Sequence, residues 1–263
     1  MNIDTRSDYH MHTLFSDGSA TIDEMARAAI SSGLTQITFT DHMPLPFDTR
    51  YAMKKEEVDQ YRLAVREARA KYDGRLVINM GIEIEYIPSL RFWIKSIAQM
   101  GWDVLIASVH SLQVGDESGM VNGTYEEFER LYRMFDYDIK SLYRNYYQTL
   151  QTAYRTGCFD IAGHLDVLKK HNVGQPFFDE NDPDYIAAVQ ETLEVIKKQE
   201  MSMEINTGGF NHPVGEQYPS RWIIREASQM GIPLVLSSDS HSPRTLRHNF
   251  DRMELLVGVE PAF

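Results

Sequence analysis

Cysteine is nearly absent from this sequence, and long apolar runs are missing. Its 263 residues include one cysteine, Cys158, which excludes an internal disulfide. No apolar run approaches the roughly 18 residues that a membrane-spanning helix needs, so we expect no membrane partner. The N-terminal stretch MNIDTRSDYH has neither the basic nor the apolar segment of a secretory signal, which predicts a cytoplasmic location.

Positive charge is also in short supply. The chain has 26 Lys and Arg against 38 Asp and Glu, a formal net charge of −12 with neutral histidines. Such a surface repels a phosphate backbone, so we expect no nucleic-acid partner. Carboxylates that bind cations would be part of this excess, and bound cations would reverse the local charge. The sequence leaves the oligomeric state open.

Short runs rich in Val, Ile and Leu alternate with longer segments of helical period. This alternation is typical of an α/β protein in which helices connect parallel strands. A chain of this length commonly forms one domain, and we expect one over residues 1–263. The predicted strands are 4–10, 36–40, 76–86, 103–109, 159–164, 201–206 and 233–238.

Three segments carry helix signals. Residues 21–33 begin with Thr21 and Glu24 in capping-box spacing and end at a glycine. Apolar residues recur at helical intervals within 54–72, and an aromatic stripe runs through 128–150 as one long helix or two. The tyrosines of this stripe could line a ligand cage, but aromatics at helical spacing usually face a core, so packing is the favoured interpretation.

Polar side chains gather at the C-terminal ends of the predicted strands. Six of the nine histidines lie there, and pairs such as His10 and His12 share a face because side chains alternate along a strand. In a closed parallel barrel all these strand ends meet on one face. The residues are His10, His12, Asp41, His42, Glu83, Glu85, His110, His164, Asn206, Asp239 and His241, with Asp17 shortly after the first strand.

This placement indicates a metal site. A single strand-end histidine could be a hydrogen-bonded core residue, but many buried imidazoles and acids are costly unless they are paired or bind metal. Imidazole and carboxylate ligands without thiolate suit Zn²⁺, Mn²⁺ or Fe. Nine candidate ligands exceed what one ion accepts, so we expect two to three divalent ions. The other histidines, His171, His212 and His248, are interpreted as ordinary loop residues.

The order of these motifs resembles that of the polymerase and histidinol phosphatase (PHP) superfamily. Within it, the chain is most similar to the histidinol-phosphate phosphatase branch. The resemblance covers residues 7–242, and the motifs that carry it are HMHTLFSD at 10–17, TDH at 40–42, GIE at 81–83, SVH at 108–110, GHLD at 163–166 and SDSH at 238–241.

The resemblance implies a distorted (β/α)7 barrel, similar to a TIM barrel, with a trinuclear metal centre at the strand C-termini. It implies hydrolysis of L-histidinol phosphate to L-histidinol and phosphate, a step of histidine biosynthesis, through attack by a metal-bridging hydroxide. His42, Glu83 and Asp239 would be catalytic. The implied ligand sets are His10, His12, Glu83 and Asp239; Glu83, His110 and His164; and Asp17, His42 and His241.

Basic side chains should complete a clamp for the substrate phosphate. Lys170 and Arg244 are the candidates, with a solvated surface charge as the alternative for each. Relatives commonly carry an arginine in the loop after Asn206, but this sequence has GGFNHPVG there, so His212 is a possible replacement. Asn206 itself could hold substrate or close its loop. Residues 43–48 and 111–123 are predicted to be loops over the site.

Other functions remain open at this stage. A PHP phosphoesterase acting on a nucleotide or another small phosphate would need the same metals and differ only in its loops. An amidohydrolase also begins with H-x-H in a barrel, but its usual metal-bridging lysine has no counterpart in the predicted strands. A non-catalytic metal-binding module is disfavoured by the full ligand set.

Overall fold

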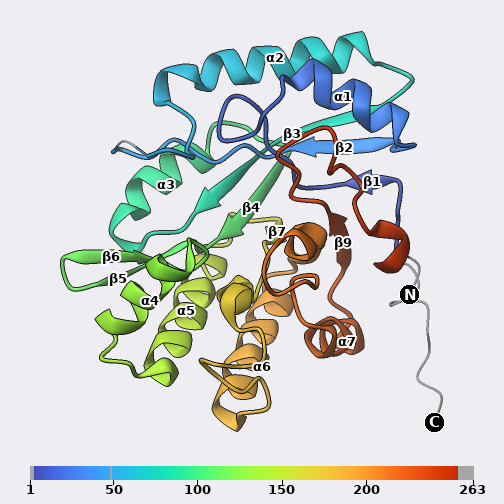
Figure 1. Ribbon diagram of the computed structural model, residues 1–263. Helices are drawn as coiled ribbons and strands as arrows, with labels where there is room; N and C mark the ends of the chain where they lie inside the picture. The colour runs from blue at the N-terminus through green and yellow to red at the C-terminus, as the bar shows by residue number, and fades with distance from the viewer. Residues whose placement is uncertain (1–2, 48, 254–263) are drawn as a thin grey trace, which may run out of the picture.

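The computed structural model describes residues 3–47 and 49–253, and seven parallel strands form its sheet (Figure 1). Tyr9 N donates to Leu236 O at 3.1 Å and Met11 bridges Ser240 in parallel, so the two edges of the sheet approach closure. The expected distorted (β/α)7 barrel is therefore confirmed. The strands, in spatial order, are β1 (Ser7–Asp8), β2 (Gln36–Phe39), β3 (Val77–Glu85), β4 (Val104–Ser108), β7 (Ile161–Ala162), β8 (Ser202–Asn206) and β9 (Leu234–Ser237).

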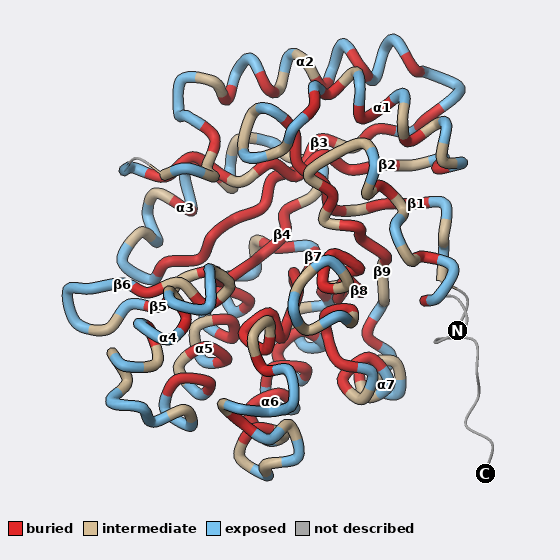
Figure 2. The backbone as a smooth tube through the Cα atoms, viewed as in Figure 1, coloured by how far each residue is buried: buried red, intermediate tan, exposed pale blue. Residues whose placement is uncertain are grey.

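Helices surround the strands and bury one face each, as Figure 2 shows. The capping box of Thr21 and Glu24 starts the first helix as predicted, and Gly33 follows its end with a φ of 83°. The helices are α1 (Ile22–Ser31), α2 (Val58–Lys71), α3 (Arg91–Ala98), α4 (Tyr125–Met134), α5 (Ile139–Tyr154), α6 (Pro183–Lys198) and α7 (Arg221–Gln229), and the 3₁₀ turns are η1 (Lys55–Glu57), η2 (Pro88–Leu90), η3 (Val167–His171) and η4 (Thr207–Asn211).

The aromatic stripe forms two helices, α4 and α5. Asp136 and Tyr137 take positive φ angles between them, and the Asp138 side chain accepts from the backbone of the first turn of α5. Tyr143, Tyr146 and Tyr147 are fully buried in the core between the sheet and α6. The interpretation of this stripe as packing is confirmed.

Residues 111–123 are not simply a loop. Ser111–Val114 (β5) and Glu117–Met120 (β6) form an antiparallel hairpin outside the barrel. Gly115, with a φ of 62°, and Asp116 make its two-residue turn. Gly-Asp between two short alternating runs was a hairpin signal that the sequence analysis missed. The other expected loop is 43–48. Residues 43–47 contain no helix or strand, and Asp48 lies outside the described residues.

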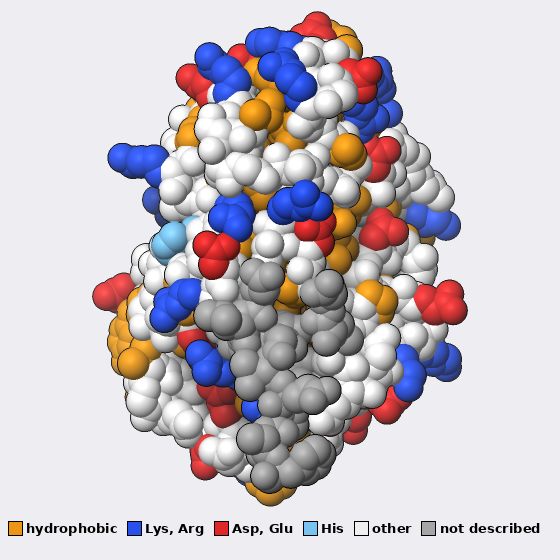
Figure 3. All heavy atoms as spheres, turned by 90° about the vertical axis from the view of Figure 1, so that its right-hand side faces the viewer, with side chains coloured by type: hydrophobic (Ala, Val, Ile, Leu, Met, Phe, Trp, Pro, Cys, Tyr) orange, Lys and Arg blue, Asp and Glu red, His pale blue; other side chains and the backbone are white. Residues whose placement is uncertain are grey.

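The described surface carries mixed charge. On the face shown in Figure 3, basic and acidic side chains are interspersed among the described residues. Within residues 3–47 and 49–253, no helix combines the length and the apolar character needed to cross a bilayer.

Candidate metal centre

Glu83, near the C-terminal end of β3, lies at the centre of the gathered imidazoles. Its Oε1 is 3.0 Å from His164 Nε2 and 3.3 Å from His110 Nε2. Its Oε2 is 2.7 Å from His42 Nδ1 and 3.4 Å from His10 Nε2. These four histidines follow four different strands, so the barrel brings distant parts of the sequence to one carboxylate.

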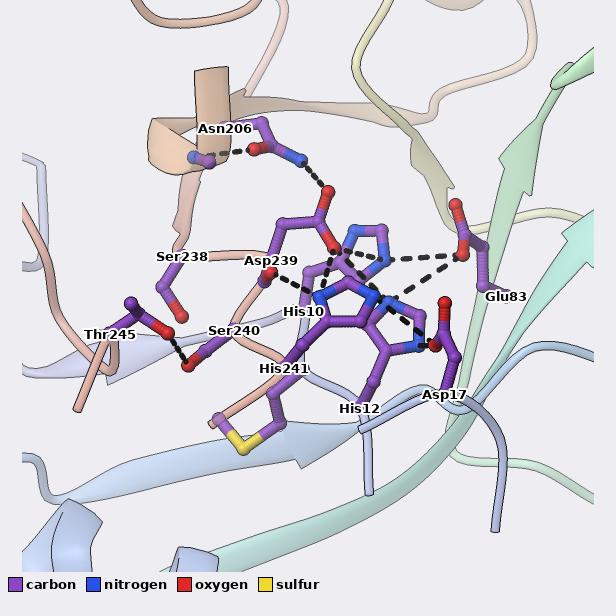
Figure 4. A network of polar contacts seen from close by, with 12 residues as sticks. His10, His12, Asp17, Glu83, Asn206, Ser238, Asp239, Ser240, His241 and Thr245 are labelled. Atoms are coloured by element: carbon purple, nitrogen blue, oxygen red, sulfur yellow. Dashed lines mark hydrogen bonds and ion pairs between the residues drawn. The ribbon is translucent and has the colours of Figure 1, made fainter. Parts of the chain in front are cut away.

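Two aspartates complete the cluster (Figure 4). Asp239 Oδ1 is 3.1 Å from His12 Nε2, and Asp17 Oδ1 is 3.2 Å from His241 Nε2. Asp17 Oδ1 also lies 3.8 Å from both His12 Nδ1 and His42 Nε2. All nine predicted ligands thus lie in one continuous network at the C-terminal mouth of the barrel.

The backbone around both aspartates is specialised. Asp239 has a φ of 51°, an uncommon conformation for a residue with a side chain, directly after the strand β9. Gly18 follows Asp17, and a Cβ at Gly18 would lie 2.6 Å from the backbone of His12. Glycine at this position allows the loop that carries Asp17 to pack against the first histidine pair.

Protein acceptors orient several imidazoles. His10 Nδ1 lies 3.0 Å from Glu204 Oε2, His110 Nδ1 lies 2.6 Å from Glu85 Oε2, and His241 Nδ1 lies 2.9 Å from the Asp239 carbonyl oxygen. A ring nitrogen that donates to such an acceptor leaves the other nitrogen free to bind a metal. In each case that other nitrogen, Nε2, faces the cluster.

Glu204 was missed in the sequence analysis. It is fully buried on β8, and its carboxylate accepts from the His164 backbone amide, Asn206 Nδ2 and Ser237 Oγ in addition to contacting His10. Its separation by two residues from Asn206 was the available signal, because it places both side chains on one strand face. Glu204 therefore belongs to the candidate site, where it contacts His10 and Asn206.

The charges of the cluster shift one another's pKa values. Burial alone would lower the pKa of His10, but Asp239, Glu204 and Glu83 raise it well above its usual value. Burial would also lower the pKa of His241. The hydrogen bond to Asp17 and the charge of Asp239 outweigh burial and raise this pKa to about 9. Without metal these imidazoles carry protons at neutral pH, so metal binding must release them.

The side chains fit divalent metal ions. Within the described residues, distances between potential ligand atoms define three groups: His12, Asp17, His42 and His241; His10, His12 and Glu83; and His42, Glu83 and His110. His10 Nε2 and His42 Nδ1 lie 3.4 Å and 2.7 Å from Glu83 Oε2, and these three buried atoms make no hydrogen bond. Buried polar atoms of this kind are usually satisfied, so their convergence is typical of a cation site.

A cavity of about 370 Å³, here called the inner cavity, opens over these ligands. Lys170 lines it and donates to the Asn122 carbonyl oxygen at 2.6 Å. His212 also lines the cavity, with its Nδ1 3.2 Å from the Tyr218 hydroxyl. Burial and, to a lesser extent, the charge of Lys170 lower the pKa of His212 to about 4. The structure thus brings Lys170 and His212 to the same space as the predicted metal ligands.

The remaining two predicted substrate residues lie elsewhere. Asn206 is buried beneath the cavity, where its amide donates to Asp239 Oδ2 at 3.1 Å and accepts from Gly208 N at 2.9 Å. Asn206 thus holds the side chain of the predicted metal ligand Asp239 and closes its own loop. Arg244 is exposed and is not among the described residues that line the cavity. Its neighbours Ser242 and Thr245 line the cavity instead.

Several known proteins are similar to this chain in sequence and in fold. A protein of Deinococcus radiodurans named probable histidinol-phosphatase is 35% identical over 92% of this chain and 89% of its own. The histidinol-phosphatase of Bacillus subtilis is 28% identical over 90% of this chain and 93% of its own. The Lactococcus lactis histidinol phosphate phosphatase, solved with zinc, L-histidinol and phosphate, has the same fold, with a TM-score of 0.77, 22% identity and coverage of 97% and 93% of the two chains.

The family assignment rests on the sequence match itself. The PHP domain model matches residues 8–208, a span that contains every predicted ligand except Asp239 and His241. The relative from Deinococcus radiodurans extends the match over nine-tenths of both chains. This chain belongs to the PHP domain family.

Proposed function

We propose that this chain is a metal-dependent phosphomonoesterase that hydrolyses L-histidinol phosphate to L-histidinol and phosphate. The observation that carries the proposal is the convergence of six imidazoles and three carboxylates at a cavity large enough for a small phosphate ester. Relatives that match nearly the whole chain and are named histidinol-phosphatase support the choice of substrate. In this proposal residues 1–263 act as one PHP-type barrel domain.

Two to three divalent ions, Zn, Mn or Fe, would occupy the cluster. The proposed ligand sets are His10, His12, Glu83 and Asp239; Glu83, His110 and His164; and Asp17, His42 and His241. Among the described residues, His12 also lies close to the ligand atoms of the third set, and His42 lies close to Glu83 and His110 of the second. Divalent ions here would neutralise phosphoryl charge and make hydroxide available near neutral pH.

The chain's own residues complete the proposed site. Lys170, whose pKa burial lowers from its usual value, presents an ammonium group on the cavity wall, where it would hold a phosphate oxygen. His212, with a pKa of about 4, is neutral at pH 7 and would offer a hydrogen bond without a charge. Asn206 would act indirectly, by fixing the carboxylate of Asp239.

Phosphate release tests this proposal. Metal-replete protein should release phosphate from L-histidinol phosphate faster than from a nucleoside monophosphate or p-nitrophenyl phosphate at equal concentration, and chelation should abolish the release. A preference for the nucleotide would reject the substrate and favour another small phosphate. Elemental analysis should find at least two metal equivalents per chain, and a smaller number in metal-replete protein would contradict the multinuclear centre.

A further inference from the structure

A second cavity adjoins the inner cavity. It has a volume of about 640 Å³ and is here called the outer cavity; it lies between the segment that includes Tyr51, the start of η2 and the β5–β6 hairpin. Among the described residues, its walls combine apolar side chains, including Ile87, Leu90 and Met120, with one acidic side chain, Glu127. The metal centre uses none of these residues.

Three observations show that the two cavities are neighbours. The Tyr51 ring lies edge to face on the ring of the ligand His42, with centroids 5.3 Å apart. Ser111 lines the outer cavity and directly follows the ligand His110 in the sequence. Glu127, in α4, acts by its charge on Lys170, which lines the inner cavity. Tyr51 and Glu127 therefore lie at the border between the inner cavity, where a phosphate would bind, and the outer cavity.

The charges at this border run in opposite directions. Lys170 faces the inner cavity, where a phosphate would bind, and Glu127 lies on the outer side. Arg50, the other charged side chain among the described residues that line the outer cavity, is exposed. Histidinol phosphate has the same polarity, because its ammonium group is on the carbon next to the phosphorylated one and its imidazole lies beyond it. A carboxylate beside an ammonium would give a charge-assisted hydrogen bond.

We propose that the outer cavity is the leaving-group subsite, in which Glu127 pairs with the substrate ammonium and Tyr51 and the apolar wall receive the imidazole. This inference rests on the proposed function and assigns to Glu127 a role in specificity. Such a subsite selects a cationic amino alcohol ester over a phosphate ester that lacks the amine, because the unpaired carboxylate gains nothing from the latter.

The chain allows the charge of Glu127 to be removed without removing its structural role. Glu127 also completes the capping box of α4, where its Oε2 accepts from Thr124 N at 2.7 Å. Glutamine fills this position in capping boxes as well as glutamate does, so Glu127→Gln keeps the helix start. The same capping box occurs at α1 with Thr21 and Glu24, which is exposed, so Glu24→Gln is a matched control.

The test compares L-histidinol phosphate with its analogue without the amine, 3-(imidazol-4-yl)propyl phosphate. In Glu127→Gln we expect kcat/KM for histidinol phosphate to fall about tenfold or more, as for loss of a hydrogen bond to a charged group, and kcat/KM for the analogue to change by less than about twofold. Glu24→Gln should leave both values unchanged.

Equal losses for both substrates in Glu127→Gln, or no loss for either, would overturn the subsite while the phosphatase proposal stands. If the unaltered, metal-replete protein releases phosphate from p-nitrophenyl phosphate but from neither imidazole ester, the proposed function fails and the subsite fails with it. The two failures are therefore distinguishable within one set of assays.

Discussion

Buried charge surrounds both Glu83 and Lys169 near the mouth of the barrel. Lys169 is fully buried, and its Nζ lies 2.7 Å from Glu216 Oε1, 2.6 Å from Ser220 Oγ and 3.2 Å from Asp166 Oδ2. An ammonium group has three protons to donate, and here each has an acceptor. The charge of this lysine is satisfied by the chain itself.

The cluster around Glu83 is matched differently. His110 Nε2 and His164 Nε2 lie 3.1 Å apart and both face Glu83 Oε1, while Glu83 Oε2 makes no hydrogen bond. Donors and acceptors are therefore not paired one to one around Glu83. Each ammonium proton of Lys169, by contrast, has an acceptor, although Asp166 Oδ1 in that cluster makes no hydrogen bond. The comparison teaches that a buried cluster indicates a ligand when several of its atoms converge on one point without hydrogen bonds, and a structural role when its central charge is paired by the chain.

The largest expected effect concerns the centre of the unsatisfied cluster. Glu83→Gln keeps the size of the side chain but removes the charge on which four imidazoles converge. We expect kcat to fall by at least about a thousandfold, comparable to the loss of a transition-state-stabilising group. Phosphate release and circular dichroism measure activity and fold; Glu194→Gln, at an exposed position of α6, is the control. Retained turnover would remove Glu83 from the centre.

Lys169→Met should act on stability instead. Removing the lysine leaves Asp166 and Glu216 without their buried partner, and we expect the free energy of unfolding to fall by about 3–5 kcal/mol. Urea unfolding measures this loss, with the exposed Lys198→Met as control. The metal content should stay unchanged. Loss of metal together with unchanged stability would reverse the distinction between the two clusters.

Glu204→Gln should have a smaller effect on activity, exerted through metal affinity. The carboxylate fixes the ring of His10 from behind, and loss of such a partner typically weakens metal binding about 10- to 100-fold. Competition with a chromophoric chelator would measure it. Glu85→Gln should weaken binding similarly through His110. If both variants bind metal as tightly as the unaltered chain, Glu204 and Glu85 are not needed to orient His10 and His110.

The smallest expected effect distinguishes His212 from the histidines of the cluster. Its pKa is lowered to about 4, whereas that of His241 is raised to about 9. Between about pH 6.5 and pH 4, His212 is protonated in the unfolded chain and neutral in the folded chain. The free energy of unfolding therefore falls as the pH drops through this range. His212→Gln should reduce this fall by about 1–3 kcal/mol, measured by urea unfolding at pH 7 and pH 4.5. An identical pH dependence would contradict a neutral His212.

Much of the barrel could be predicted from local patterns. The seven predicted strands are confirmed, and all except the polar β1 (Ser7–Asp8) lie in short apolar runs. The helix signal at Thr21 and Glu24 is confirmed because a capping box needs only four residues. The β5–β6 hairpin was missed because its strands are short and half exposed, although its Gly-Asp turn was visible.

The site could be predicted in outline and not in its supporting contacts. The predicted ligands were found because histidines at strand ends are unusual and period two fixes their face. Glu204 was missed because one acid within a strand is unremarkable until the fold places it 3.0 Å from His10. Lys169 and Lys170 are adjacent in η3, and only packing sends one into the salt-bridge cluster and the other into the inner cavity.

The sequence by itself determined which residues can bind metal and that they recur after successive strands, because both follow from residue type and local period. Only the tertiary structure decided which nitrogen of each imidazole faces Glu83, which acids lie behind the ligands and which lysine enters the cavity. These depend on contacts between distant segments, such as His10 with Glu204, separated by 194 residues, and His12 with Asp239, separated by 227. No local pattern encodes the distance between two such side chains, because barrel closure sets it.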